Sequence, residues 1–84
     1  MFYFYIFKCK DKSLYSGVTN DLEKREVTHN LGKGSKYVWA RGGGKIIYSE
    51  RFRTLGGALK REAEVKKFSR KEKLDLIKLV KIKK

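Results

Sequence analysis

The sequence has one cysteine, no long apolar run and few acidic residues, and each shortage excludes a class of protein. Cys9 cannot form an internal disulfide and has no partner at metal-ligand spacing, which favours a reducing intracellular setting. We interpret it as a strand residue rather than a nucleophile, because free cysteines are usually buried. The apolar stretch that includes Tyr3 to Phe7 is far shorter than the roughly 20 residues that cross a bilayer, and no signal-peptide cleavage site follows a hydrophobic stretch. We therefore expect a cytoplasmic protein without a membrane segment.

Acidic residues are outnumbered by basic ones, 9 against 22, which gives a formal charge of +13. This charge is larger than solubility requires of a small domain, so a polyanion is the expected partner. Nucleic acid fits best, because neutralised phosphates release counterions on binding. One alternative is a lysine-rich thermostable surface, although such surfaces usually balance Lys with Glu. Another is an anionic membrane under the basic tail at about 79–84, which lacks aromatic anchors.

A chain of 84 residues can bury one small core, so we expect a single domain over residues 1–84. Residues 2–9 and 14–19 are rich in aromatic and β-branched side chains and predict two strands, which the short turn between them would pair antiparallel. Residues 45–52 predict a third strand. The predicted class is an α/β (α+β) domain with a three-stranded antiparallel sheet flanked by helices, in the order β-β-α-β-α-α.

Three helices are predicted from their capping residues. Asn20 with Glu23 forms a capping box that begins a helix over 21–31, and Gly32 ends it. Thr54 caps a second helix that runs to about residue 68. Ser69 with Glu72 forms another capping box and begins a last helix to about residue 79.

The segment 32–44 contains five glycines together with the basic residues Lys33, Lys36 and Arg41. This composition predicts a mobile basic loop beside the ligand. Tyr37 and Trp39 lie between the charges, where they could stack on bases. The alternative that one or both pack onto the sheet is equally consistent with the sequence. These five side chains, Lys33, Lys36, Tyr37, Trp39 and Arg41, are the predicted nucleic-acid-binding residues.

A spaced set of polar residues has the composition of a phosphate-cleaving centre: Tyr5, Tyr15, Arg25, His29 and Glu62. Such a centre needs a metal-binding carboxylate, a cation for the charge that develops on phosphorus, and a group that orients or deprotonates the nucleophile. Arg25 and His29 are one helical turn apart and share a face, so they can address one point.

Glu62 falls within the apolar arc of its predicted helix, which is formed by Leu55, Ala58, Leu59, Ala63 and Val65. A buried carboxylate without a partner costs several kcal/mol, so Glu62 needs an opposite charge. Helical geometry alone leaves two interpretations open. The partner is a metal ion, or it is a cationic side chain such as Lys66 or Arg25.

Together these residues resemble the GIY-YIG nuclease superfamily. The resemblance rests on the segments Tyr5-Ile6-Phe7, Leu14 to Asp21, Arg25, His29, Gly32 to Tyr37 and Ala58 to Glu62, and it covers roughly residues 3 to 78. The chain is most similar to small stand-alone members and to the amino-terminal nuclease domain of the excision-repair subunit UvrC. The resemblance implies a metal-dependent endonuclease that acts on DNA in repair or recombination.

The resemblance also implies roles for single residues. Tyr5 and Tyr15 match the tyrosines of the two name-giving motifs, and Arg25 matches the arginine that contacts the scissile phosphate. His29 stands where many members have a histidine or tyrosine that assists proton transfer. Glu62 matches the glutamate that binds one divalent ion, Mg²⁺ or Mn²⁺. Whether Tyr5, Tyr15 or His29 is the general base stays open.

The chain departs from the family pattern at several positions. Tyr3-Phe4 replaces the leading Gly-Ile, Val18 stands where some members have lysine, and Ala63 replaces a frequent tyrosine. The asparagine that many members carry after the metal-binding helix is absent. These departures keep a second hypothesis open, a catalytically weak or inactive nucleic-acid-binding module of the same fold. Binding to RNA and targeting by a protein partner are further alternatives, and the oligomeric state is not predicted.

Overall fold

The computed structural model describes residues 1–33 and 36–82, without the side chains of Tyr37 and residues 80–82. Its centre is a three-stranded antiparallel sheet in the order β2-β1-β3, formed by β1 (Phe2–Cys9), β2 (Leu14–Thr19) and β3 (Gly44–Phe52). The aromatic and β-branched β1 is the central strand, which explains why four consecutive residues, Phe4 to Phe7, are buried. A register shift between Ile6 and Phe7 interrupts the pairing of β1 with β3.

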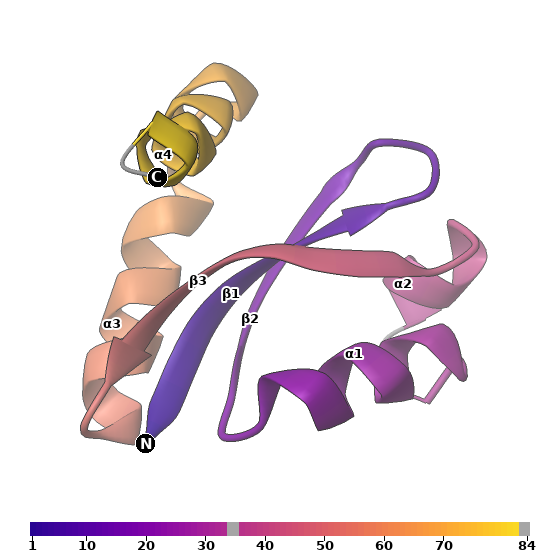
Figure 1. Ribbon diagram of the computed structural model, residues 1–84, viewed down its shortest axis with the longest axis horizontal. Helices are drawn as coiled ribbons and strands as arrows, with labels where there is room; N and C mark the ends of the chain where they lie inside the picture. The colour runs from indigo at the N-terminus through magenta and orange to yellow at the C-terminus, as the bar shows by residue number, and fades with distance from the viewer. Residues whose placement is uncertain (34–35, 83–84) are drawn as a thin grey trace.

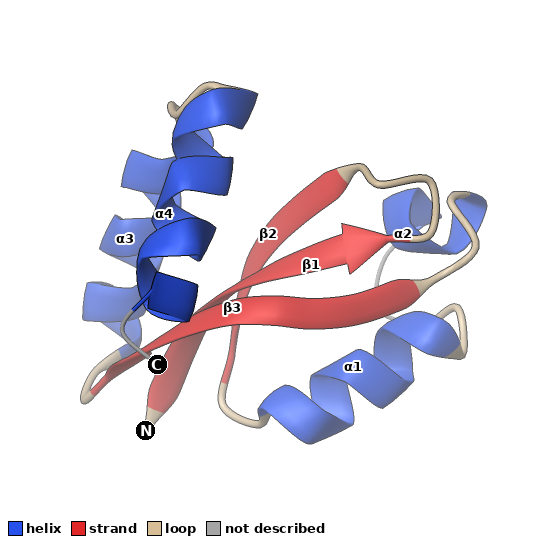
Figure 2. Ribbon diagram, turned by 45° about the horizontal axis from the view of Figure 1, so that its top comes forward, coloured by secondary structure: helices blue, strands red, loops and turns tan. Residues whose placement is uncertain are grey.

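Helices cover both faces of this sheet (Figures 1 and 2). Helices α1 (Leu22–Asn30) and α2 (Lys36–Ala40) lie on one side, and α3 (Leu55–Lys66) and α4 (Arg70–Ile82) lie on the other. Because side chains alternate along a strand, β1 supplies two separate cores. Phe4 and Ile6 pack with Val65 on the α3 side, whereas Tyr5 and Phe7 pack with Val38 on the α1 side.

The predicted class and the order of the six main elements are confirmed, and local signals account for most boundaries. Ser69 accepts a hydrogen bond from the Glu72 amide at 3.2 Å, and the Ser69 amide donates to the Glu72 carboxylate at 2.9 Å, so this capping box forms as predicted. Thr54 caps α3 by accepting from the Gly57 amide. Helix α4 continues to Ile82, three residues further than we expected.

Three expectations about local structure are wrong. Asp21, not Asn20, caps α1, because its side chain accepts from the Lys24 amide at 3.0 Å. The predicted loop over 32–44 contains α2, which is held to the sheet by the fully buried Val38. Leu55 and Leu59 of the predicted apolar arc are each 46% exposed, and Ala63 is exposed, so α3 buries a narrower stripe, centred on Ala58 and Val65.

The predicted tail is only partly described, since residues 83–84 and the side chains of 80–82 lie outside the described part. Within that part, every helix is too short or too polar to cross a bilayer.

Candidate active site

A buried hydrogen bond between Tyr5 and His29 forms the centre of the candidate site. Tyr5 projects from β1 toward α1, and its hydroxyl lies 2.9 Å from His29 Nε2. The imidazole is fully buried and is surrounded by the rings of Tyr5, Phe7 and Tyr15, whose centroids lie 5.9, 5.0 and 5.4 Å from its own. The second ring nitrogen, Nδ1, has no hydrogen-bond partner among the described residues. The tyrosines of both motifs therefore meet the single histidine on one face of the sheet.

Burial changes the proton affinities of this pair. Loss of solvent raises the pKa of Tyr5 to about 12; the Arg25 charge opposes this rise, and Tyr15 and Glu62 add to it. Burial also lowers the pKa of His29, and the neighbouring Arg25 lowers it further. At neutral pH the pair therefore consists of a protonated phenol and a neutral imidazole.

Arg25 lies one turn before His29 on α1, and its charge acts on both Tyr5 and His29. The side chain is half-buried and forms no ion pair or hydrogen bond with any described residue. It also lies on the wall of a pocket of about 210 Å³ whose other lining residues come from the end of β2, the turn that follows it and one face of α1. Of the five predicted catalytic residues, only Arg25 lines this pocket. The guanidinium is thus placed near Tyr5 and His29 with its donors available to an anion.

Gly17 gives the Tyr5 phenol its position. Gly17 pairs with Tyr5 across β1 and β2, and the Tyr5 ring lies over its Cα. A Cβ at this position would stand 2.5 Å from the Tyr5 oxygen, closer than real Cβ atoms approach. Only glycine therefore lets the phenol extend across the edge strand.

Glu62 comes from α3, on the opposite face of the sheet, yet its charge reaches Tyr5. Its side chain is 20% exposed, and Lys66 Nζ lies 3.7 Å from Oε2, so the ion pair predicted as one alternative is present. Lys66 itself is 61% exposed and can leave this contact for solvent. No group of three or more His, Cys, Asp or Glu residues in the described part of the chain could hold a metal ion. Any ion at Glu62 would therefore take at most two such side chains from the described residues.

The structure thus brings Tyr5, Tyr15, Arg25 and His29 together, whereas Glu62, on α3, is linked to them through the effect of its charge on Tyr5. The predicted nucleic-acid-binding residues lie in α2 and on either side of it. Lys33 and Lys36 are exposed, and Trp39 is 60% exposed and does not pack onto the sheet, because its ring lies against Gly32. Arg41 pairs with Asp11 at 3.4 Å. The Tyr37 side chain lies outside the described residues.

Two polar side chains that the sequence did not single out fix α1 on the sheet. Glu26 accepts a hydrogen bond from the Ile46 amide at 2.7 Å. Asn30 donates to the Gly44 carbonyl and accepts from the Gly44 amide, both at 2.9 Å. Their spacing of four residues on one helical face was the available signal. By anchoring α1 to β3, they set the positions of Arg25 and His29.

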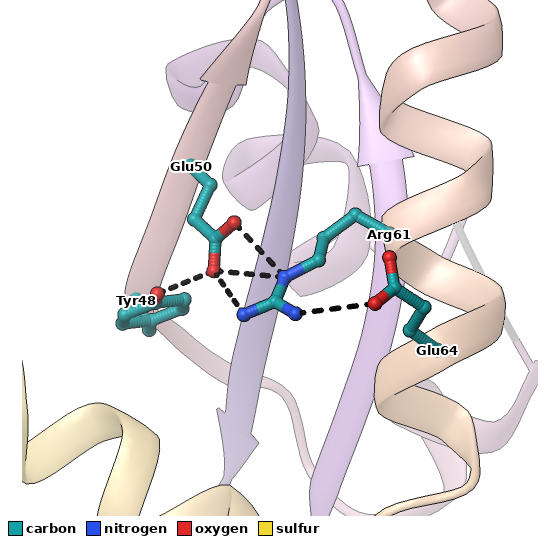
Figure 3. Close-up of polar contacts among 4 residues, drawn as sticks. All are labelled: Tyr48, Glu50, Arg61 and Glu64. Carbon is teal, nitrogen blue, oxygen red and sulfur yellow. Dashed lines mark hydrogen bonds and ion pairs between the residues drawn. The ribbon is translucent and has the colours of Figure 1, made fainter.

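A polar cluster fixes α3 in a similar way (Figure 3). Arg61, the neighbour of Glu62, donates to both oxygens of Glu50 on β3 at 3.0 to 3.2 Å, and Tyr48 donates to the same carboxylate. Burial and the hydrogen bond to Glu50 raise the pKa of Tyr48 to about 12, so this phenol stays protonated. Arg61 also contacts Glu64 at 3.7 Å. The cluster holds the turn of α3 that carries Glu62 against the sheet.

Comparison with known proteins identifies the family. A model of the GIY-YIG catalytic domain matches residues 1–75. The chain belongs to the GIY-YIG family. A UPF0213 protein of Staphylococcus saprophyticus is 53% identical over 75 residues, which cover 89% of this chain and 92% of the relative. A UPF0213 protein of Clostridium perfringens is 52% identical over 77 residues, which cover 92% and 83%.

A solved structure supports the same conclusion. The solution NMR structure of a UPF0213 protein from Bacillus halodurans matches with a TM-score of 0.60 and 40% identity, over 94% of this chain and 85% of that one. The GIY-YIG family is a nuclease family that acts on nucleic acids and generally uses divalent metals. The resemblance seen in the sequence is therefore confirmed at the level of family and fold.

Proposed function

We propose that this chain is a metal-dependent endonuclease that hydrolyses phosphodiester bonds in DNA. The observation that carries the proposal is the buried Tyr5–His29 hydrogen bond, with the unpaired Arg25 guanidinium and the Glu62 carboxylate beside it. A structural role alone would not require a histidine, two tyrosines, an arginine and a glutamate from four different elements to meet. The match to a catalytic-domain family adds independent support.

The surroundings of Glu62 fit a divalent ion that prefers oxygen ligands, Mg²⁺ or Mn²⁺. Mg²⁺ usually keeps several waters and takes one or two carboxylates plus substrate phosphates. A single carboxylate whose lysine partner is exposed suits an ion that binds together with the substrate, and Mn²⁺ accepts the same oxygen donors. When bound, the ion would supply Lewis-acid stabilisation of charge on the phosphate and leaving oxygens.

The protonation states suggest how the water is activated. Tyr5, with its pKa near 12, is a poor base by itself, whereas neutral His29 can accept a proton at Nε2. We infer that Tyr5 takes a proton from the attacking water as it passes its own to His29. Arg25 would then offset the negative charge on the equatorial phosphate oxygens, and Tyr15 would help to orient the water. This choice favours the Tyr5–His29 pair over Tyr15 as the basic group.

The cellular role follows from the substrate. We propose that the enzyme acts inside the cell on DNA in repair or recombination, with a protein partner to direct it, because so small a chain has little surface for choosing a substrate. The alternative of an inactive binding module predicts DNA binding without cleavage.

The test is nicking of supercoiled plasmid by wild type and by Glu62→Gln, with Mg²⁺, Mn²⁺ or EDTA. We expect Glu62→Gln to lower the nicking rate at least about a hundredfold while binding to DNA is kept, since only charge stabilisation at the reacting phosphate is lost. Glu64→Gln, an exposed position two residues along the same helix, is the control and should nick at the wild-type rate.

Three outcomes separate the hypotheses. Nicking by Glu62→Gln at the wild-type rate would show that Glu62 is not the metal ligand. Wild-type nicking that persists in EDTA would contradict the metal requirement. Wild-type protein that binds DNA but never nicks it with either metal would establish the binding module instead.

A further inference from the structure

A second cationic site lies at the end of the sheet, where β1 ends and β3 begins. A pocket of about 430 Å³ is lined there by Lys8, Cys9, Lys10, Lys12, Gly44 and Lys45. We call it the lysine pocket. Its four lysines are distinct from the residues of the candidate active site and from those predicted to bind nucleic acid around α2. Their ammonium groups form no ion pair with any residue that the structure describes.

The strand register places two of these positive charges directly across from each other. Lys8 on β1 and Lys45 on β3 are directly paired across the antiparallel ladder, and both are exposed. Opposite residues in such a ladder have Cβ atoms about 4.5 to 5.5 Å apart, so like charges there destabilise the sheet. No acidic side chain of the described residues relieves this repulsion. A ligand that carries negative charge would do so.

The surroundings of the pocket keep the field positive. Arg70, at the start of α4, donates to the Lys12 carbonyl at 2.9 Å and so brings a fifth cation to the rim. Among the described residues, the acidic Asp11 and Glu26 lie near this end of the sheet: Glu26 accepts from the Ile46 amide, and the Asp11 carboxylate is engaged by Arg41 at 3.4 Å and by Ser13 at 2.6 Å. These contacts lower the pKa of Asp11, mainly through Ser13. The Asp11 carboxylate is therefore already paired and does not neutralise the lysines.

The position of the pocket suits an extended polyanion. Lys8 is three residues from Tyr5 along β1, about 10 Å at the rise of a strand, and the alternation of side chains places it on the α3 side of the sheet, opposite Tyr5. The rim also joins the α2 region, because the Lys10 amide donates to the Gly43 carbonyl and Arg41 contacts Asp11. A nucleic-acid backbone that runs from the active site past the α2 region can thus reach the lysine pocket by passing round the end of the sheet.

We propose that the lysine pocket binds backbone phosphates of the nucleic acid on one side of the scissile bond, with Lys8 and Lys45 as the central contacts. This inference rests on the proposed function for its choice of ligand. It adds a binding site away from the reacting phosphate, and that site fixes where the backbone runs.

The test compares the double variant Lys8→Gln/Lys45→Gln with Lys67→Gln/Lys78→Gln. The second pair is also exposed and removes the same charge from α4 and from the end of α3. Binding to a short duplex DNA is measured in EDTA across salt concentrations. If two phosphate contacts are lost, the slope of log Kd against log salt should fall by about 1.8, and affinity at 0.15 M salt should fall about 30-fold. The control should keep its slope and lose less than about threefold.

Thermal unfolding of the same proteins excludes a folding defect. Removal of two opposed like charges should leave the Tm of Lys8→Gln/Lys45→Gln unchanged or higher, so that binding and stability move in opposite directions. Equal loss of slope in both double variants would overturn the proposal, because only total charge would then matter. A lowered Tm that accompanies the weaker binding would overturn it as well.

Nicking assays keep this outcome separate from that of the proposed function. If the wild type nicks DNA and the lysine variant binds and nicks it normally, the proposal for the lysine pocket fails and the proposed function stands. Weaker binding by the lysine variant of a protein that never nicks would support the pocket and reject the nuclease.

Discussion

Gly17 shows how one missing side chain positions the reactive group. The Tyr5 phenol lies where a Cβ of residue 17 would be, and Tyr5 is almost fully buried against His29. The ring can move away only by breaking its hydrogen bond to the imidazole. Glycine at position 17 is therefore required to make room for the Tyr5 phenol. The strand itself does not need it, since the other residues of β2 favour the extended conformation.

We predict that Gly17→Ala lowers the free energy of unfolding by about 1 to 3 kcal/mol, the usual cost of overpacking, and lowers nicking more than stability alone explains. Urea denaturation and plasmid nicking measure the two effects. In a Tyr5→Phe background the same substitution should cost less, since the nearest atom is gone.

Gly56→Ala is the matched control. A Cβ at Gly56 meets nothing within 4 Å, and the residue lies within α3. We expect this change to raise the free energy of unfolding by up to about 1 kcal/mol, because alanine is the better helix former. A Gly17→Ala protein as stable and active as wild type would contradict the steric account.

At the scale of elements, α3 is positioned by its ion pair with β3. The Glu50 and Arg61 side chains are each 24% exposed and share two-pronged hydrogen bonds, whereas Glu64 is 56% exposed and contacts Arg61 at 3.7 Å (Figure 3). Burial and geometry make the first pair the stronger one. Since Glu62 follows Arg61 directly, this pair also sets the place of the proposed metal ligand.

We predict that Glu50→Gln lowers the free energy of unfolding by about 1 to 2 kcal/mol, because the ion pair with Arg61 is lost and the amide nitrogen that replaces one oxygen cannot accept a hydrogen bond. The identical substitution at Glu64 should cost less than about 0.5 kcal/mol. Urea denaturation measures both, and nicking should fall only in Glu50→Gln as Glu62 loses its support. Equal costs for the two variants would mean that the Glu50–Arg61 pair does not fix α3.

The elements differ in how far the sequence reveals them. The Ser69–Glu72 box and the Thr54 cap are local signals, so the starts of α3 and α4 were predictable. Helix α2 was not, because five residues are too few to show a helical period and its single anchor, Val38, lies among glycines and lysines. The opposition of Lys8 and Lys45 was hidden too, since it depends on a strand register that includes the shift after Ile6.

The residues proposed to act in the candidate site could be named from the sequence, whereas those that support them in the fold could not. Spaced motifs can be recognised without knowledge of the fold, and they include Tyr5, Tyr15, Arg25, His29 and Glu62. Glu26, Asn30 and Arg61 act through backbone groups or carboxylates 11 to 20 residues away. Such partners are fixed only when the elements pack, so their roles became visible in the structure.

At the scale of the whole molecule, net charge opposes folding and favours binding. The protein measures 28 × 27 × 26 Å and carries +13. At 0.01 M salt the screening length is about 30 Å, so every positive charge repels every other, whereas at 1 M it is about 3 Å. Self-repulsion of this kind destabilises the compact state. A bound polyanion relieves the same repulsion, and a molecule of this length would cover about 8 base pairs of duplex at 3.4 Å each.

Salt should therefore act on the Tm in opposite directions with and without DNA. We predict that the Tm of the free protein rises between 0.01 and 0.5 M salt as repulsion is screened. With an excess of a 12-base-pair duplex, the Tm should start higher and fall over the same range, because stabilisation by a ligand follows RT ln(1 + [L]/Kd) and Kd rises steeply with salt. A duplex of the same sequence with an uncharged methylphosphonate backbone should reproduce the curve of the free protein. Since both curves come from one protein in one buffer series, their convergence at high salt would show that the excess of lysine and arginine serves binding at the expense of stability, and parallel curves would show that it does not.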